Sequence, residues 1–359
     1  MAAGGAIEDF GGWPGILGRL FARQDLSAAE AEAALDSVLT GLAAPSQIAA
    51  FAAALRTKGE TTEEMVGLVR AMRGRGVRIE LGPGLLDTCG TGGDRSGSIN
   101  VSTMAAVVAA AAGAAVCKHG GRAASSVSGS ADVFEALGVA VDLGPEGVAN
   151  CIKETGLGFC LAPRFNPAMR HAAPVRRELG TPTVFNFLGP LANPASATRQ
   201  LIGVGDPSMA ERMVAVLEAN GTEHAWVVYG EDGLDELSTV APSRVLETRR
   251  VGAGAYERRS FVVDASTLGL ERAEAGELRG GSPAENAAVV ESVFAGEKGR
   301  RRDFVALNSA AALVVAGIAE DLAEGLERAQ SILEAGRAAE TLAALVSVSR
   351  REAGQAQQG

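Results

Sequence analysis

The sequence has little of what builds metal centres, disulfide frameworks or large aromatic cores. It contains four cysteines and three histidines in 359 residues, and aromatic side chains make up only 4% of it. The cysteines, Cys89, Cys117, Cys151 and Cys160, show no CxxC spacing. We therefore expect neither a zinc site nor a disulfide framework, and we interpret the cysteines as small buried hydrophobic residues.

An excess of positive charge, a signal segment and a membrane span are also lacking. Lys and Arg number 33 against 43 Asp and Glu, a net charge of −10, which argues against a general nucleic-acid binder because such proteins need basic patches. The longest apolar run, at 104–117, is shorter than the roughly 20 residues that span a bilayer. The N-terminal stretch MAAGGAIEDF lacks the basic and apolar regions of a secretory signal. We expect a cytoplasmic protein without nucleic-acid or membrane partners, in which an anionic substrate needs a local basic pocket.

The patterning predicts an α/β protein that begins with helices. Residues 1–83 look helical, with capping boxes at Ser27-x-x-Glu30 and Thr61-x-x-Glu64. From Leu85 onward apolar strands alternate with helices, and the expected strands are LLDTC, AAVCK, LGFCLAP, RQLIGVGD and HAWVVYG. This alternation predicts a mostly parallel central sheet flanked by helices, followed by amphipathic helices over 284–351. We predict a small helical N-terminal domain over 1–83 and a larger α/β domain over 84–359.

The first informative loop, GTGGDRSGSINVST at 90–103, follows a predicted strand, and ligands bind beyond the carboxyl ends of parallel strands. Its glycines let backbone N–H groups approach a ligand, and Ser102 or Thr103 opens a helix whose N-terminus attracts anions. Asp94 is placed to bond a sugar hydroxyl. The spacing matches neither GxxxxGK[ST] nor a properly placed GxGxxG, so an ordinary nucleotide loop is not indicated. A tight strand–helix turn is the alternative interpretation.

The second loop, CKHGGRAASS at 117–126, also links a predicted strand to a helix. It adds the cations Lys118, His119 and Arg122 to glycines, with no acid close by in the sequence. Hydroxyls follow at Ser125, Ser126, Ser128 and Ser130. Two adjacent loops of this kind suit a diphosphate or a phosphorylated sugar, because such ligands need several clusters of donors. The alternative is a basic surface turn.

Two further loops supply acids and arginines. GEDGLDELS at 230–238 places Asp235 and Glu236 after a strand, where they could bind Mg²⁺ together with phosphate oxygens; solvated surface acids are the alternative. Residues 164–194 carry Arg170, His171, Arg176 and Arg177, which we expect on one basic helix. One of these side chains could grip a substrate carboxylate in bidentate fashion.

These motifs resemble those of the anthranilate phosphoribosyltransferases, of the nucleoside-phosphorylase-like class of phosphoribosyltransferases. GTGGD, NVST, KHGGRAASS, SGSADVFEALG, PVRRELGTPTVFNFLGPLANP and DGLDELS follow the family's order, and the resemblance covers essentially the whole chain. It implies transfer of the phosphoribosyl group from 5-phosphoribosyl diphosphate (PRPP) to the amine of anthranilate, in tryptophan biosynthesis. It also implies a homodimer and a site between the two domains, with helices from about 165–190 joining the helical domain.

The resemblance assigns roles by motif. It implies that Lys118 and Arg176 act in catalysis and that Mg²⁺ is bound by Ser102, Asp235 and Glu236. Arg176 would grip the anthranilate carboxylate. The implied substrate-binding residues besides Arg176 are Gly90, Gly93, Asp94, Ser98, Asn100, Val101, Ser102, Thr103, Lys118, His119, Gly120, Gly121, Arg122, Ala123, Ala124, Ser125, Ser126 and Ser130.

The chain departs from the family pattern on the acceptor side. Gly121 stands where the family's KHGN motif has asparagine, and Asn166 replaces a histidine of the FHPAM-like motif. Val127 stands where a lysine is common. Two alternatives to anthranilate transfer therefore remain: the same chemistry on another aromatic acceptor, or a non-catalytic relative that binds a phosphorylated ligand.

Overall fold

A computed structural model of the chain describes residues 5–94, 96–123 and 127–356. It begins with a bundle of four helices, α1 (Gly12–Phe21), α2 (Ala28–Leu39), α3 (Pro45–Lys58) and α4 (Thr62–Arg75), after a short 3₁₀ turn η1 (Ile7–Phe10). The two predicted capping boxes are confirmed, because Ser27 and Thr61 each accept from the backbone N–H of the glutamate three residues later. These caps start α2 and α4 where the sequence indicated.

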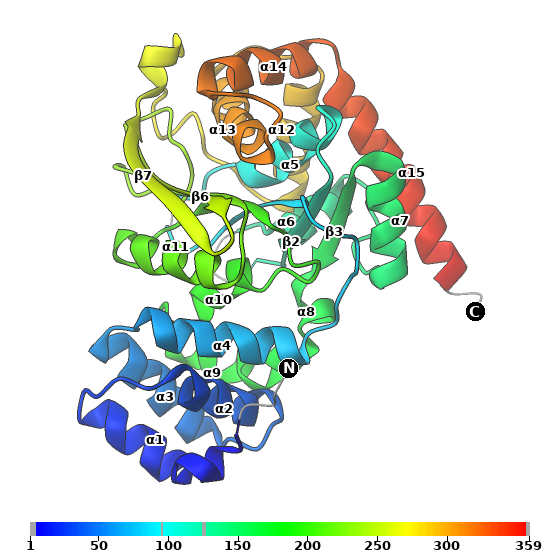
Figure 1. Ribbon diagram of the computed structural model, residues 1–359. Helices are drawn as coiled ribbons and strands as arrows, with labels where there is room; N and C mark the ends of the chain where they lie inside the picture. Colours follow the sequence, from blue (N-terminus) through cyan, green and yellow to red (C-terminus); the bar gives the residue numbers. More distant parts are fainter. Residues whose placement is uncertain (1–4, 95, 124–126, 357–359) are drawn as a thin grey trace.

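A seven-stranded sheet follows, in the order β3-β2-β1-β4-β5-β6-β7 (Figure 1). The strands are β1 (Leu86–Gly90), β2 (Val116–Gly120), β3 (Leu157–Leu161), β4 (Arg199–Gly203), β5 (His224–Gly230), β6 (Ser243–Gly252) and β7 (Ala255–Val263). The first five are parallel, whereas β6 and β7 form an antiparallel hairpin at one edge. The predicted fold class is confirmed; the hairpin is an addition that the sequence analysis did not predict.

Helices cover both faces of the sheet, so its parallel strands are buried on both sides. The sheet-covering and peripheral helices are α5 (Val101–Ala111), α6 (Ser130–Ala136), α7 (Pro145–Thr155), α10 (Phe185–Leu191), α11 (Ala210–Ala219), α12 (Pro283–Phe294), α13 (Arg300–Ala316), α14 (Leu322–Glu334) and α15 (Arg337–Ala356), with 3₁₀ turns η3 (Pro207–Met209) and η4 (Ala265–Leu268). In Figure 1, α10 and α11 lie between the sheet and the N-terminal bundle, while α5, α12, α13 and α14 lie beyond the sheet. No helix of the described chain has the length and apolar character needed to cross a membrane.

The predicted basic helix within 164–194 is wrong as a single element. The chain there forms α8 (Ala162–Phe165), the 3₁₀ turn η2 (Pro167–His171), α9 (Ala173–Leu179) and α10. Pro167 and Pro174 lack a backbone N–H and restrict the residues before them, which divides the segment. The division separates Arg170 and His171, on η2, from Arg176 and Arg177, on α9.

The interior contains two hydrophobic cores, one on each face of the sheet. Alternate residues of a strand serve different cores: Leu201 joins the core with α5 and α13, whereas its neighbour Ile202 joins the other. That second core continues through α10 and α11 into the N-terminal bundle, where it includes Trp13 and Phe51. The N-terminal bundle and one face of the sheet therefore share one continuous apolar cluster.

Candidate active site

The loops singled out by sequence meet at the carboxyl ends of neighbouring strands. β1 lies between β2 and β4, so the chain winds outward from β1 in one direction through β3 and in the other through β5. Such a reversal of strand order is the usual ligand position in an open parallel sheet. The four strands around it end in glycine, at Gly90, Gly120, Gly203 and Gly230.

Glycine at these strand ends lets the acidic loop 230–238 lie directly over the sheet. A Cβ atom at Gly90 would collide with the Asp235 carboxylate, and one at Gly203 would collide with the Asp235 backbone carbonyl. The backbone N–H of Gly92 donates to Asp235 Oδ2 at 2.7 Å. The structure thus joins the glycine loop and the acidic loop, which lie far apart in sequence.

Asp235 and Glu236 are buried and are not solvated surface acids, since each residue is only 8% exposed. Burial, with the nearby Asp94, raises the pKa of Asp235 to about 7. Burial and the repulsion of Asp235 raise the pKa of Glu236 well above its usual value. Two buried acids that repel one another and can both ionise only beside a cation form a chemically suitable donor set for Mg²⁺.

Protein carboxylates alone do not complete a metal cage at this place. Within residues 5–94, 96–123 and 127–356, no three His, Cys, Asp or Glu side chains are grouped so as to hold a metal ion. Mg²⁺ usually takes one or two carboxylates and shares its other positions with water and substrate phosphates. The donor set fits an ion that arrives with a phosphorylated substrate.

Lys118 lies under the glycine loop rather than on the surface. Its side chain is 1% exposed, and its ammonium donates to the Thr88 carbonyl at 2.5 Å and lies 3.4 Å from Ser102 Oγ. Burial lowers the pKa of Lys118, while the charges of Asp87 and Glu236 oppose that shift. The predicted site residues Lys118 and Ser102, from two different loops, are therefore brought together at the start of α5.

Among the described residues, Thr103 Oγ1 of the glycine loop is buried without a hydrogen-bond partner, although an unpaired buried polar atom is costly. Asp94 of the same loop lies beside the Asp235 carboxyl. The helix after the loop begins at Val101, with Asn100 as its N-cap, slightly earlier than the predicted start at Ser102 or Thr103. Asn100 Nδ2 donates to the Ser128 carbonyl at 3.2 Å and so joins the first loop to the second.

Arg122 has acid partners that the sequence analysis did not foresee. Its guanidinium pairs with Glu135 and, at 3.4 Å, with Asp132, both from α6. Asp132 also accepts from the Ala123 backbone N–H at 2.8 Å. The charge of Arg122 is thus neutralised by acids of α6, although no acid directly adjoins it in the sequence. The predicted site residues Ala124, Ser125 and Ser126 lie outside the described residues.

His119 is held as a neutral imidazole. Its Nδ1 lies 3.2 Å from the Gly189 carbonyl, and its Nε2 lies 3.4 Å from Nδ2 of Asn166. A carbonyl can only accept and an amide NH₂ can only donate, so the proton belongs on Nδ1. Burial lowers the pKa of His119 to about 4. Asn166, one of the two departures from the family pattern on the acceptor side, thus donates to the unprotonated Nε2 of His119.

Arg176 and His171 are the partly buried members of the four basic residues expected on one helix, and the Arg176 guanidinium lies 5.9 Å from the centre of the Phe185 ring. Burial lowers the pKa of Arg176. No acid in the described part of the chain forms an ion pair with it. Its neighbour Arg177 is exposed. Arg176 therefore combines partial burial with a charge that is available for an anionic group.

A buried polar link that was not predicted from the sequence lies beneath the two loops. The Asp87 carboxylate accepts from the His119 backbone N–H at 3.1 Å and from Asn193 Nδ2 at 2.8 Å. Asn193 also donates to the Cys117 carbonyl at 2.8 Å. Burial raises the pKa of Asp87 to about 6. An acid inside the apolar strand LLDTC was the available signal, since a buried charge needs partners.

Comparison with known proteins finds matching families and relatives over nearly the whole chain. Residues 82–339 match the family model of the glycosyl transferase family a/b domain, and residues 14–76 match that of its helical bundle domain. The anthranilate phosphoribosyltransferase of a Nocardioides strain is 52% identical over 344 residues, covering 94% of this chain and 99% of the relative. That of Roseiflexus castenholzii is 49% identical over 326 residues, covering 90% and 95%.

Solved structures are similar over the same range. The anthranilate phosphoribosyltransferase of Thermus thermophilus superposes with a TM-score of 0.85 at 42% identity, covering 93% of this chain and 99% of that one. The Saccharomyces cerevisiae enzyme in complex with PRPP and Mg has a TM-score of 0.85 at 26% identity, covering 94% and 98%. The same yeast enzyme in complex with 4-fluoroanthranilate has a TM-score of 0.84 at 25% identity, with the same coverage.

Proposed function

The chain belongs to the anthranilate phosphoribosyltransferases, and we propose how its residues divide the work. The reaction transfers the phosphoribosyl group of PRPP to the amine of anthranilate and releases diphosphate, a step of tryptophan biosynthesis. The observation that carries the residue assignment is the meeting of three strand-end loops, in which Lys118 reaches Ser102 and Asp235 lies over Gly90 and Gly92.

We assign the sugar diphosphate to the two glycine loops. Loop amides and the N-terminus of α5 provide oriented donors, and Lys118 provides a point charge. Thr103 Oγ1, which has no partner in the described chain, supports this assignment, because a bound ligand would give it one. The residues in this role are Gly90, Gly93, Asp94, Ser98, Asn100, Val101, Ser102, Thr103, Lys118, His119, Gly120, Gly121, Arg122, Ala123 and Ser130.

Mg²⁺ is the proposed cofactor, held by Ser102, Asp235 and Glu236 together with diphosphate oxygens. When bound, the ion neutralises charge that develops on the diphosphate leaving group. The raised pKa values of Asp235 and Glu236 support a cation at this place, since its charge would favour their ionised forms.

The acceptor is assigned to the surface formed by His119, Gly121, Asn166 and Arg176. The Arg176 guanidinium is free to bind the anthranilate carboxylate by two parallel hydrogen bonds. Asn166 keeps the His119 ring oriented and neutral. At Gly121, the nearest atom of the described residues that an added Cβ would meet is Ala162 Cβ, at 3.9 Å, so these residues leave room for the asparagine that the family has there.

The chemistry requires alignment and charge neutralisation more than a strong base. An arylamine is a usable nucleophile, and the transition state has oxocarbenium character as diphosphate departs. Lys118 stabilises the departing diphosphate, while Arg176 and the glycine loops hold the two reactants in line. Lys118 and Arg176 are therefore the proposed catalytic residues.

The same proposal extends to organisation and location. The helical domain over 1–83, joined by helices from about 165–190, would close the acceptor side, and the domain over 84–359 would bind PRPP. Contacts of α9 with α3 and of α10 with α4 support this division. We further propose a homodimer, which the family resemblance implies, and a cytoplasmic location, which four buried free cysteines support.

One assay tests the function against its alternatives. The protein is incubated with PRPP and Mg²⁺, and loss of anthranilate fluorescence is followed together with diphosphate release. Both signals are expected, in equal amounts. Diphosphate release with another aromatic acceptor but not with anthranilate would reassign the acceptor, and absence of release with every acceptor would support a binding protein.

A further inference from the structure

The second half of the first glycine loop (residues 90–103) is held by a segment outside the proposed active site. This segment comprises residues 277–281, between η4 and α12. The Ile99 backbone N–H donates to the Leu278 carbonyl at 3.0 Å, and the Gly280 N–H donates to the Gly97 carbonyl at 2.8 Å. Ser98 and Arg279 form an isolated antiparallel bridge between these bonds. Residues 97–100 therefore take their position from this segment, which we call the bracing segment.

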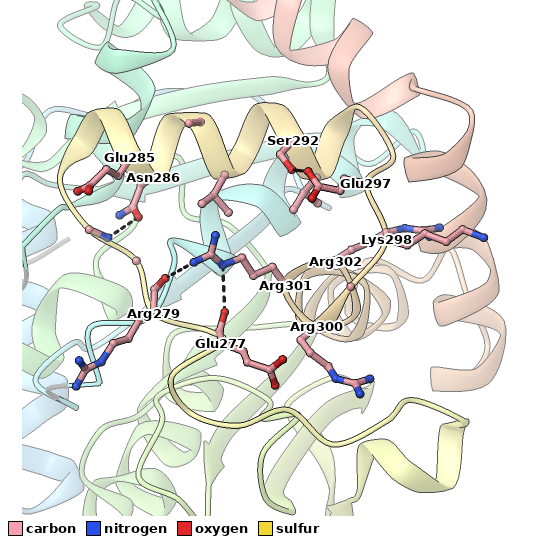
Figure 2. Close-up of a pocket in the computed structure, with 16 residues that line it drawn as sticks. Glu277, Arg279, Glu285, Asn286, Ser292, Glu297, Lys298, Arg300, Arg301 and Arg302 are labelled. Atoms are coloured by element: carbon pink, nitrogen blue, oxygen red, sulfur yellow. Dashed lines mark hydrogen bonds between the residues drawn. The ribbon is translucent and has the colours of Figure 1, made fainter.

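Arg301, in the first turn of α13, fixes the bracing segment from its other side. Figure 2 shows its guanidinium reaching across a cavity of about 610 Å³ toward the backbone of Glu277 and Arg279. Its Nε donates to the Glu277 carbonyl at 3.1 Å, and its Nη2 donates to the Arg279 carbonyl at 3.0 Å. Both bonds are charge-assisted, so they are stronger than bonds between neutral groups.

Asn286 on α12 joins the bracing segment to both PRPP loops. Its Oδ1 accepts from the Gly281 N–H at 2.8 Å, and its Nδ2 donates to Asn100 Oδ1 at 2.8 Å. Asn100 then donates through Nδ2 to the Ser128 carbonyl at 3.2 Å. The Gly281 N–H can only donate and the Ser128 carbonyl can only accept, so the two amides have one consistent orientation. Asn286 is 3% exposed, which makes a reversed amide costly.

We propose that Asn286 and Arg301 are positioning residues for PRPP binding: Arg301 holds the bracing segment, and Asn286 orients Asn100, which ties the glycine loop to the loop after β2. This inference rests on the proposed assignment of PRPP to those loops. Neither residue belongs to the set assigned to substrate or metal, and both act through other residues.

The main test is Asn286→Asp, which keeps the shape of the side chain but replaces its donor by an acceptor. At pH 8 the introduced carboxylate faces Asn100 Oδ1, so we expect the KM for PRPP to rise about tenfold while the KM for anthranilate changes by less than about twofold. Asn286 is buried, and burial raises the pKa of a carboxyl; lowering the pH from 8 to 6 should therefore increase the protonated form, which can donate, and narrow the difference from wild type.

The other charged groups around the cavity do not disturb that comparison. They are Glu277, Arg279, Glu285, Glu297, Lys298, Arg300, Arg301 and Arg302, and they are present in both proteins, so their own titration affects the two pH profiles alike. A matched control is Asn150→Asp. That amide also donates to an oxygen, of Glu352 at 2.8 Å, but it joins α7 to α15, and we expect no change in the KM for PRPP.

Arg301→Gln provides an independent test if the first variant folds poorly. We expect a rise of about fivefold in the KM for PRPP, whereas the neighbouring Arg300→Gln should leave it unchanged. Arg300 pairs with Glu271, which is 78% exposed, and such surface pairs contribute little. Thermal unfolding of every variant separates misfolding from a local effect.

The outcomes separate this inference from the proposed function. Unchanged PRPP KM values in both Asn286→Asp and Arg301→Gln, with turnover intact, would overturn the positioning role. Equal rises in the KM for PRPP and for anthranilate would also overturn it. Failure of the wild-type protein to use PRPP at all would instead overturn the assignment on which the inference rests.

Discussion

The PRPP side and the acceptor side of the proposed site are built differently. On the PRPP side, buried charged side chains bond to backbone groups in or just after β1: Lys118 donates to the Thr88 carbonyl, and Asp235 accepts from the Gly92 N–H. On the acceptor side, short helices interrupted by prolines carry Arg176, which has an aromatic neighbour but no acid partner in the described chain. Many mutual contacts leave the PRPP side little freedom to change, whereas the acceptor side can change one residue at a time.

Two neighbouring glycines show this contrast within one loop. A Cβ at Gly120 would collide with Ser130 Oγ at 2.2 Å and lie 3.1 Å from the Phe159 ring, so a side chain there requires these neighbours to shift. At Gly121 the nearest atom of the described residues is Ala162 Cβ at 3.9 Å, so these residues leave room for a side chain. The departure from the family pattern occurs at the glycine that has room around it.

The largest expected effect is on the PRPP side, for Asp235→Asn combined with Glu236→Gln. Removing both negative charges removes the donors proposed for Mg²⁺, and we expect kcat to fall by at least about a hundredfold. The measurement is steady-state turnover over a range of Mg²⁺ concentrations. Glu231→Gln, an exposed acid of the same loop, is the control, and undiminished turnover in the double variant would remove both acids from the mechanism.

Arg176→Ala should give the next largest effect, and it should affect the acceptor. Loss of a charged, two-point contact with the anthranilate carboxylate is expected to raise the KM for anthranilate about 10- to 100-fold, with the KM for PRPP nearly unchanged. Arg177→Ala, its exposed neighbour, should change neither value. An increase in the KM for PRPP of the same size would contradict the division into two sides.

Because of His119, the free energy of unfolding should decrease as the pH is lowered. Burial lowers its pKa from 6.5 to about 4, so between these pH values the unfolded chain binds more protons than the folded one. Stability is therefore complete above pH 6.5 and is lost as the pH falls, by roughly 2 kcal/mol between pH 7 and pH 5. The measurement is urea unfolding of the wild type and of His119→Gln at both pH values.

The difference between these two proteins isolates the histidine, because all other titrating groups are shared. A loss of stability toward pH 5 that is equal in the two proteins would show that His119 is not its source.

Gly121→Asn should give the smallest effect. The position accepts a side chain, and one added hydrogen bond to the acceptor is expected to lower the KM for anthranilate by a few-fold, about 1 kcal/mol or less. Gly120→Ala is the contrasting variant, and we expect it to weaken PRPP binding because of the collision with Ser130. An unchanged KM for anthranilate in Gly121→Asn would show that the missing asparagine does not limit acceptor binding.

Local signals in the sequence were sufficient for most of the fold. The capping boxes at Ser27 and Thr61 and the apolar strands ending in glycine follow from neighbouring residues alone, and the structure confirms them. The hairpin β6–β7 was missed because its strands carry many charged residues, such as Arg249 and Arg250, and lack a clear apolar face. One edge of this sheet therefore had no hydrophobic pattern to find.

The site was predictable in its loops but not in its long-range contacts. Glycines and hydroxyls after strands indicated where a ligand would bind. However, Arg122 pairs with Glu135 and Asp87 accepts from Asn193, and both of these partners come from other parts of the chain. Asn166 appeared only as a departure from a motif, and its contact with the His119 ring required the folded chain. Spacing in sequence does not show which polar groups meet across two loops.

The apolar cluster shared by the N-terminal bundle and one face of the sheet has a consequence for synthesis on the ribosome. Helices α1 to α4 emerge first, but α10 and α11, which complete their cluster, follow only at Phe185–Leu191 and Ala210–Ala219. Part of the apolar surface of the nascent bundle therefore stays exposed until more than half of the chain has been translated. A truncated protein that ends before α10 would expose that surface permanently, so incomplete chains of this enzyme should be substrates for chaperones and proteases rather than stable fragments.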